Sequence, residues 1–337
     1  MASTIQKLYA LKVPEIRRVF LETIQNMVDG AVLSEIEKAI QANDVEQALK
    51  ACGFSQAVLS NILTVIEKVY DEAATDTVKS WPKRIGMIRP VYNAWSDRVI
   101  SDIQQYSSVF VTNITNEMRE TVRNVLAEGI NQGVNPRVTA LNLVGRYDAT
   151  TKKRTGGFIG LSQNQTKWVF NAEKYLKTLD ENYFNLSLRD KRFDKTVRSA
   201  IEKNKPLSAE TVEKLVSAYK SKALKYRADA IARTETMQSI NRGKTAAINQ
   251  GIEEGLFKKE NVKKWWDDTG DGRTRKSHRY LGLRYGKKNA IPIDEAFRTF
   301  DGDSLMFPGD TSLGADASEI IHCRCGVQYI VDFMANG

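Results

Sequence analysis

The sequence predicts a mainly α-helical protein with a small β-containing C-terminal region, an α+β fold whose N-terminal half is helical. Apolar residues recur at steps of three and four as far as Gly251, which is the period of amphipathic helices. Beyond Gly255 the pattern changes to short alternating segments separated by turns, as in strands. We therefore expect a helical region over 1–150, a second helical region over 151–260 and a β- and loop-rich tip over 261–337.

The N-terminal region carries start and stop signals for several helices. Pro14 precedes an amphipathic segment that Gly30 closes, so we expect the first helix between them. Asp44 is placed to cap a helix over Val45–Ala51, because its side-chain oxygen can accept from a free backbone N–H. The other segments of this region with helical spacing are 32–40 and 55–70.

Further helices are expected over 92–106, 114–130 and 138–144, the last after Asn135-Pro136. Aromatic side chains in this stretch recur at helical spacing, which favours packing in the core over a platform for stacking bases. These aromatic residues are Tyr92, Trp95, Tyr106 and Phe110.

The segment 146–160 is rich in Thr, Lys, Arg and Gly, and we expect a domain boundary or a mobile loop there. Ser162 is placed to cap the next helix, and Ser208 to cap the longest helical pattern in the chain.

Arg233 falls on the apolar stripe of that long helical pattern. A guanidinium cannot be buried without a partner, and Asp229, one turn earlier, is within reach. Glu235 points to another side and needs a contact of its own.

Polar and sulfur-bearing motifs are concentrated between Trp265 and Cys325, where both histidines and two of the three cysteines fall. They are Trp265-Trp266-Asp267-Asp268-Thr269-Gly270-Asp271-Gly272-Arg273-Thr274-Arg275, His278, Phe307-Pro308-Gly309-Asp310 and His322-Cys323-Arg324-Cys325. Upstream lie Gly160-Leu161-Ser162-Gln163-Asn164-Gln165, Leu188-Arg189-Asp190-Lys191-Arg192-Phe193 and Arg227-Ala228-Asp229-Ala230-Ile231-Ala232-Arg233-Thr234-Glu235-Thr236. This ordered series resembles the signature of the phage Mu F-like minor head proteins, the phage head morphogenesis family, over roughly residues 155–330.

The resemblance implies a minor capsid protein of a tailed bacteriophage, present in the phage head after assembly in the host cytoplasm. It implies association with the portal, the major capsid protein or both, and action by binding in capsid assembly, DNA packaging or DNA ejection. We expect no enzyme, no catalytic residue and no cofactor. Because an ADP-ribosyltransferase domain is sometimes fused to this family, the alternative is a virion-delivered enzyme, either a toxin-like ADP-ribosyltransferase or a zinc-dependent hydrolase.

Residues 321–331 alternate as in a half-buried strand, which would place Cys323 and Cys325 on one side and His322 on the other. With His278 and one carboxylate, the two thiols would offer four ligands to zinc. The Cys-x-Cys spacing departs from the Cys-x₂₋₄-Cys pattern of structural zinc sites, so we expect buried thiols packed as small apolar residues and no metal ligand. The carboxylates considered as a fourth ligand are Asp267, Asp268 and Asp271.

Other apparent motifs are weak. Gly243-Lys244-Thr245 matches only the end of a phosphate-binding loop and lies in a helical segment. The series that opens at Asp267 has His278 where a calcium loop requires a glutamate. We expect instead that charged side chains make hydrogen bonds that hold an irregular, loop-rich module together. These side chains are Arg273, Arg275, His278, Asp310 and Arg324.

Composition and charge favour a globular protein with an anionic partner. The net charge is +9 and the hydrophobic fraction 42%. Basic residues are distributed along the chain, which suits weak, sequence-blind contact with packaged double-stranded DNA; the alternative is that the excess charge serves solubility alone. No apolar run approaches the length of about 20 residues that a membrane span needs, and no secretory signal is apparent, so we expect no membrane partner. Three cysteines favour a reducing compartment. The basic groups lie at Lys152-Lys153-Arg154, Lys191-Arg192, 220–227, Lys258-Lys259, Lys263-Lys264 and Lys287-Lys288.

Overall fold

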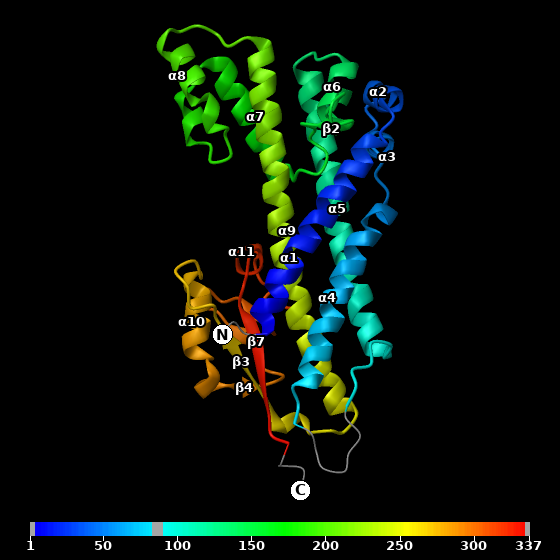
Figure 1. Cartoon of the computed structure of the whole chain (residues 1–337), viewed down its shortest axis with the longest axis vertical. Coiled ribbons are helices and arrows are strands. Elements are labelled where there is room, and N and C mark those ends of the chain that lie inside the picture. The colour runs from blue at the N-terminus through cyan, green and yellow to red at the C-terminus, as the bar shows by residue number, and fades with distance from the viewer. Residues whose placement is uncertain (1–3, 83–89, 334–337) are drawn as a thin grey trace. The chain divides into compact units, whose positions relative to one another are not determined.

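The computed structural model describes residues 4–82 and 90–333, and helices dominate this part of the chain (Figure 1). The expectation of a mainly α-helical fold with a few strands near the C-terminus is confirmed. The α-helices are α1 (Thr4–Asp29), α2 (Leu33–Gln41), α3 (Val45–Ala51), α4 (Ser60–Lys79), α5 (Asp97–Asn131), α6 (Pro136–Val144), α7 (Gln163–Thr178), α8 (Asp194–Glu202), α9 (Ala209–Glu253), α10 (Lys276–Arg284) and α11 (Ala317–Ile320).

All strand pairs are antiparallel among the described residues. β1 (Arg146–Asp148) and β2 (Lys153–Thr155) form a hairpin. The largest described sheet has the order β4-β3-β7, so β3 lies in its centre. The strands after the hairpin are β3 (Val262–Asp267), β4 (Ile291–Pro292), β5 (Phe297–Arg298), β6 (Ser304–Leu305) and β7 (Gly326–Val331), with β5 paired to β6.

The chain forms two compact units that are discontinuous in sequence. The terminal unit comprises Met1–Arg18, Ile62–Tyr106 and Asp229–Gly337, and the inner unit comprises Val19–Asn61 and Ser107–Ala228. The long helices α1, α5 and α9 contribute residues to both units. The units therefore do not follow the expected boundaries after residues 150 and 260, because one continuous helix can supply core residues to two units.

Local signals place several helix starts correctly. The Asp44 side chain accepts from the Gln47 backbone N–H at the start of α3. Ser162 and Gln165 form a reciprocal capping box at the start of α7. The segment 146–160, expected as a boundary or mobile loop, contains the β1–β2 hairpin and lies within the inner unit.

Two helix boundaries differ from expectation. Pro14 lies inside α1 and does not precede it. An interior proline costs about 3 kcal/mol, and burial of Ile16, Phe20 and Ile24 beyond it offsets that loss. The two helices expected over 92–106 and 114–130 are one helix, α5, because no glycine or proline separates them.

The aromatic residues expected in the core are not all buried. Tyr106 and Phe110 are buried on α5, as expected. Trp95 is 84% exposed, so its assignment to the core was wrong. It lies in a turn before α5 begins at Asp97, where helical spacing does not apply.

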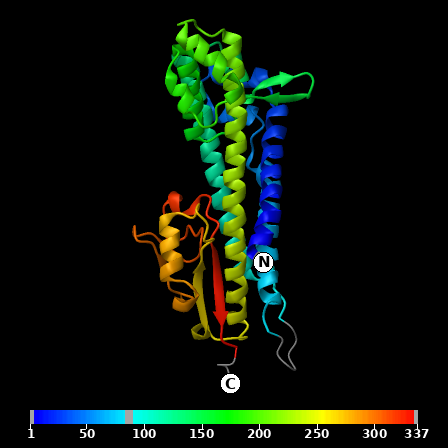
Figure 2. The ribbon, with the colours of Figure 1, turned by 60° about the vertical axis from the view of Figure 1, so that its left-hand side comes forward.

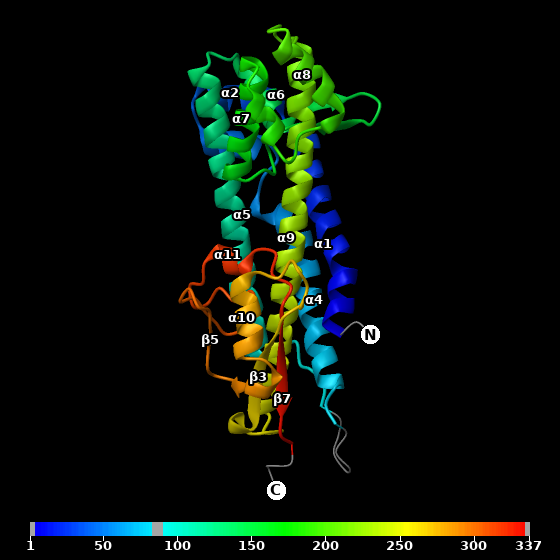
Figure 3. The same ribbon diagram turned by 90° about the vertical axis from the view of Figure 1, so that its left-hand side faces the viewer.

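In the terminal unit, the β4-β3-β7 sheet packs against helices. Figure 2 shows β7 beside the C-terminal part of α9, where the Thr245 and Tyr329 hydroxyls lie 2.7 Å apart. α10 packs against β3, as Figure 3 shows. Between these elements lies an apolar core cluster. Its buried residues are Trp266, Leu281, Tyr285, Phe297, Leu305, Phe307, Cys323, Cys325 and Val327.

Candidate functional site

The segment before β7 carries the two C-terminal cysteines. The strand expected from Ile321 begins only at Gly326, so the expectation was wrong for the first five residues. His322 adopts a positive φ of 60°, which a strand does not allow, and its backbone N–H donates to Thr234 Oγ1 at 3.0 Å. Cys323 and Cys325 are nevertheless buried together, with 3% and 2% of their surface exposed.

His278 on α10 completes this cluster. Its imidazole is 1% exposed, and its Nδ1 lies 3.5 Å from Cys323 Sγ and 3.4 Å from Cys325 Sγ. The three donor atoms all lie within 4.8 Å of one another. The Trp266 ring meets the imidazole edge to face, with centroids 4.9 Å apart. The structure therefore brings together the three residues that sequence analysis had weighed as zinc ligands.

Glu319 contacts the other side of the imidazole. Its Oε2 lies 2.9 Å from His278 Nε2, and the Ser277 hydroxyl donates to both carboxylate oxygens at 3.0 and 2.8 Å. No sequence motif indicates Glu319, because it lies on the four-residue helix α11. This carboxylate faces the nitrogen that points away from the thiols.

The three carboxylates considered as a fourth ligand are used elsewhere. Asp271 makes a bidentate pair with Arg324, and both distances are 2.7 Å. Asp267 accepts from the Gln328 side-chain amide at 2.8 Å. Asp268 packs against Gly282, where an added Cβ would lie 2.8 Å from its carboxylate. In the described part of the chain, the metal-binding group at this position contains only His278, Cys323 and Cys325.

The proton affinities within the cluster depend on its contacts. Burial lowers the pKa of His278, but its contacts with Cys325 and Glu319 outweigh burial and leave that pKa raised. The contact with Cys325 lowers the pKa of Cys323, whereas the contact with Cys323 and burial raise the pKa of Cys325. Burial raises the pKa of Glu319, but its contacts with His278 and Ser277 leave it lowered overall. The mutual contact therefore separates the proton affinities of the two thiols, and Cys323 releases its proton more readily than Cys325.

Most of the charged motif residues hold neighbouring segments of the terminal unit. Arg275 donates to the carbonyl of Ile321 at 2.6 Å and to that of Ser318. Asp310 is buried and accepts from the backbone N–H groups of Met306 and Ser312 at 2.8 and 2.9 Å. These bonds satisfy backbone groups that short strands leave without partners.

Arg273 is less involved in this network than expected. Its side chain is largely exposed and lies 3.6 Å from Asp271. Arg324 takes both carboxylate oxygens of that aspartate, so Arg273 contributes only a peripheral charge.

Helix α9 supplies further polar groups to the same region, and no sequence motif indicates them. The buried Asn241 amide donates to the carbonyls of Pro308 and Cys325 at 2.9 and 3.2 Å, and its oxygen accepts from the Val327 N–H at 3.0 Å. Lys244 Nζ donates to the Val327 carbonyl at 2.6 Å. Lys244 thus makes its hydrogen bond inside the terminal unit. Gly243-Lys244-Thr245 lies within α9, so its interpretation as a helical segment is confirmed.

The contacts expected for Arg233 are wrong. Arg233 is exposed, and Asp229 pairs with Arg17 at 3.3 Å. A helix of 45 residues buries different faces along its length, so a stripe extended from one end does not predict burial at the other. Glu235 does make its own contact, accepting from the Tyr106 hydroxyl, and burial raises the pKa of Glu235 to about 7.

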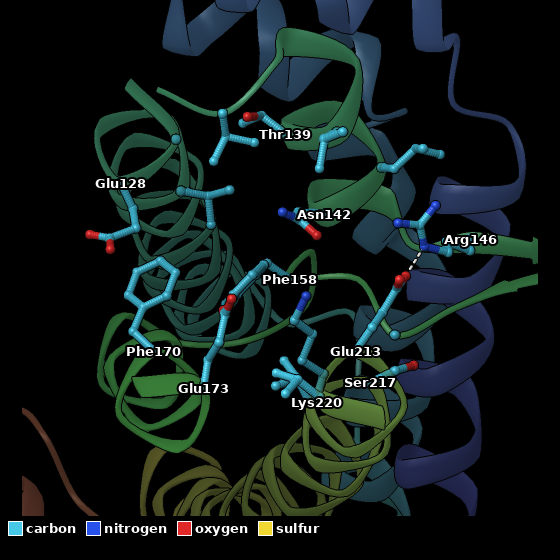
Figure 4. Close-up of a pocket in the computed structure, with 18 of the residues that line it drawn as sticks. Glu128, Thr139, Asn142, Arg146, Phe158, Phe170, Glu173, Glu213, Ser217 and Lys220 are labelled. Atoms are coloured by element: carbon cyan, nitrogen blue, oxygen red, sulfur yellow. Dashed lines mark hydrogen bonds and ion pairs between the residues drawn. The ribbon is translucent and has the colours of Figure 1, made fainter. Parts of the chain in front are cut away.

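The inner unit contains a second candidate site, a cavity of about 520 Å³ (Figure 4). Lys220 on α9 is 5% exposed and points into this cavity, with its Nζ 4.0 Å from the centroid of the Phe158 ring. Burial lowers the pKa of Lys220 to about 8, although Glu173 and Glu213 act in the opposite direction. A buried lysine of this kind can act as a base or a nucleophile. Three carboxylates and three basic side chains line the same cavity, and Glu213 and Glu173 pair with Arg146 and Lys177, so the lining has no excess negative charge.

Some of the basic groups expected to face DNA are buried. Lys220 lies in the cavity, Arg227 is buried beside Glu117, and buried Lys264 donates to the Met306 carbonyl. These three cations cannot contact a phosphate backbone. Those that remain exposed include Lys152, Lys153, Lys191, Lys258, Lys263, Lys287 and Lys288.

Comparison of the chain with protein-family models, with curated proteins and with solved structures gives no match. Among the described residues, no single helix is long and apolar enough to cross a membrane; only the bent pair Val45–Ala51 and Gln56–Lys79 meets those criteria when taken together.

Proposed function

We propose that this chain is a minor capsid (head morphogenesis) protein of a tailed bacteriophage that acts by binding. Its place would be beside the portal or the major capsid protein, during capsid assembly, DNA packaging or DNA ejection. The ordered motifs over roughly residues 155–330 support this proposal through their resemblance to the phage Mu F-like proteins.

The observation that carries the proposal is how the motif residues are used. Asp271, Asp310 and Arg324 make their hydrogen bonds within the terminal unit, and Asn241, which lies outside the motifs, does the same from α9. Residues that turn over a substrate need to converge on an accessible cavity. The cavity in Figure 4 is lined by other residues. A motif devoted to internal bonds suits a protein that presents a stable surface to partners.

Direct contact with packaged DNA is a further part of the proposal. The exposed lysines are scattered, so each would contact phosphates without reading bases. Binding of the full-length chain to random-sequence duplex DNA should therefore be weak, independent of sequence and steeply reduced by salt. Changing both Lys152 and Lys153 to Glu should weaken it and lower the salt dependence. Binding that persists unchanged at high salt would argue against phosphate contact.

The location of the chain in particles tests the capsid role. The full-length chain, tagged, is produced together with the head proteins of its own phage, and heads are purified before and after DNA filling. We expect a constant number of copies per head and image density beside the portal or the inner shell. A chain that stays in the free fraction and is missing from both kinds of head contradicts the proposal.

The enzyme alternative predicts a different outcome when heads are assembled without this chain. An enzyme carried in the virion would be dispensable for assembly, so heads lacking the chain would form and fill normally. The Lys220→Met variant further distinguishes the capsid role from the enzyme, because it removes the buried amine of the cavity and leaves the motif contacts of the terminal unit in place. If heads that contain the Lys220→Met variant form and fill normally but lose an effect on the host after infection, the enzyme is favoured.

A further inference from the structure

The spacing of His278, Cys323 and Cys325 matches that of ligands around one metal ion. The imidazole Nδ1 lies 3.5 and 3.4 Å from the two sulfur atoms. Zinc bonds of about 2.3 Å to sulfur and about 2.05 Å to nitrogen, at a tetrahedral angle, separate the two ligand atoms by about 3.6 Å. All three donor atoms lie within 4.8 Å of one another, so a single ion can reach each of them.

The imidazole alone cannot hydrogen-bond both thiols at once, and the second thiol then has only the neighbouring sulfur, a weak acceptor, as its partner. If the imidazole proton is on Nε2, facing Glu319, then Nδ1 offers one lone pair to two S–H groups. If both ring nitrogens carry protons, the single Nδ1–H can donate to one sulfur at a time. A cation among the three atoms takes the nitrogen lone pair and both sulfur atoms together.

Glu319 supplies the outer contact that metal-bound histidines commonly have. Such a histidine usually presents its second nitrogen to a carboxylate, which holds the ring orientation and strengthens the ligand. Glu319 Oε2 is 2.9 Å from His278 Nε2, and Ser277 donates to that carboxylate from the same helix as the histidine. Both Glu319 and Ser277 are buried. The ring is thereby held with Nδ1 toward the thiols.

We propose that His278 Nδ1, Cys323 Sγ and Cys325 Sγ bind one zinc ion, and that Glu319 orients the imidazole. Thiolate and imidazole ligands suit zinc, and three protein donors leave one tetrahedral position for water. The site lies in the apolar core of the terminal unit, beside Trp266, and the ion would tie α10 to the segment before β7. This site follows from the geometry of the cluster and is independent of the proposed capsid role.

Metal titration of the reduced full-length chain tests the site. The protein is stripped of metal with a chelator and titrated with Zn²⁺, or with Co²⁺ as a spectroscopic probe. We expect one ion per chain, and a cobalt spectrum with thiolate charge-transfer bands and the intense visible bands of a tetrahedral site. Cys325→Ser should lower zinc affinity by more than about 100-fold, because even outer contacts of a ligand are worth about 10–100-fold.

Cys52→Ser is the matched control. Cys52 is also a free, fully buried thiol, but it lies in the inner unit and outside the histidine cluster. This variant should bind zinc as the unaltered chain does. An equal loss in both variants would overturn the site, because the loss would then reflect general damage to the fold.

Two other results would also overturn the proposal. One is an unaltered chain that, after any Cys323–Cys325 disulfide has been reduced, still binds no stoichiometric zinc. The other is bound cobalt without thiolate charge-transfer bands. The cobalt spectrum of the unaltered chain decides the matter even where Cys325→Ser fails to fold.

Discussion

His278 Nε2 lies 2.9 Å from a carboxylate oxygen of Glu319, and this contact joins helix α10 to helix α11. Both side chains are buried, so the imidazole is held from behind while its Nδ1 faces the two thiols. The orientation of the His278 ring thus decides whether Nδ1 and the two sulfur atoms can face the same point.

Replacing Glu319 tests that orienting role. Glu319→Gln keeps the size of the side chain and removes its negative charge, so the imidazole becomes a weaker ligand and its ring is held less firmly. We expect zinc affinity to fall by about 10–100-fold while the stoichiometry stays at one ion per chain. Competition with a chromophoric chelator measures the change. Ser277→Ala, which removes only the hydroxyl that holds the carboxylate, should have a smaller effect; an unchanged affinity in Glu319→Gln would show that the contact does not orient the ring.

Asn241 should be the polar residue of α9 on which the terminal unit depends most. Asn241→Ala leaves the carbonyls of Pro308 and Cys325 and the N–H of Val327 without their partner. Burying such groups unpaired costs about 1–3 kcal/mol each, and partial rearrangement leaves an expected loss of about 2–3 kcal/mol in the free energy of unfolding. Urea denaturation followed by tryptophan fluorescence measures it. Asn249→Ala, at a half-buried position on the same helix, is the control, and equal losses in the two variants would contradict the assignment.

Gly243 should be required for the close approach of α4 and α9. A Cβ at this position would lie 2.1 Å from the backbone carbonyl oxygen of Tyr70, so Gly243→Ala forces the helices apart. Overpacking of this kind costs about 1–3 kcal/mol or more in the free energy of unfolding. Thermal unfolding should show a clear decrease in Tm. Gly272→Ala, where an added Cβ meets open space, should leave the Tm nearly unchanged. A Tm for Gly243→Ala equal to that control would mean that the helices are farther apart than described.

Lys220 should make stability rise with pH in the alkaline range. Burial lowers the pKa of Lys220 from 10.5 to about 8, so between these values the unfolded chain binds more protons than the folded chain. The contribution of this lysine to stability therefore increases as the pH rises from about 8 to about 10.5, by up to about 3 kcal/mol. Lys220→Met removes the buried charge, so it should be more stable than the unaltered chain at pH 7, with the difference shrinking toward pH 10.

Urea denaturation at several pH values measures this difference. Lys225→Met, an exposed substitution on the same helix, controls for the loss of one positive charge. A stability difference for Lys220→Met that stays constant over the whole range would contradict the burial of a protonatable amine.

Sequence spacing was most informative where a structure depends on neighbouring residues. The Asp44 cap and the Ser162 capping box involve residues three apart, so both could be predicted. Spacing was least informative where helices are long. Pro14 lies inside a continuous helix and Arg233 is exposed, because packing at one point of a long helix does not follow from the pattern at another.

The sequence by itself determined that this protein is mainly helical, with short strands near the C-terminus. It brought Cys323, Cys325 and His278 forward as candidate zinc ligands, but their spacing predicted buried thiols without a metal. Those conclusions follow from local periodicity and from residue chemistry. Only the tertiary structure decided that the three donor atoms meet, that Glu319 holds the ring, and that Lys220 is buried in a cavity. These are contacts between residues distant in the chain, and they depend on how helices and loops pack, which no local pattern encodes.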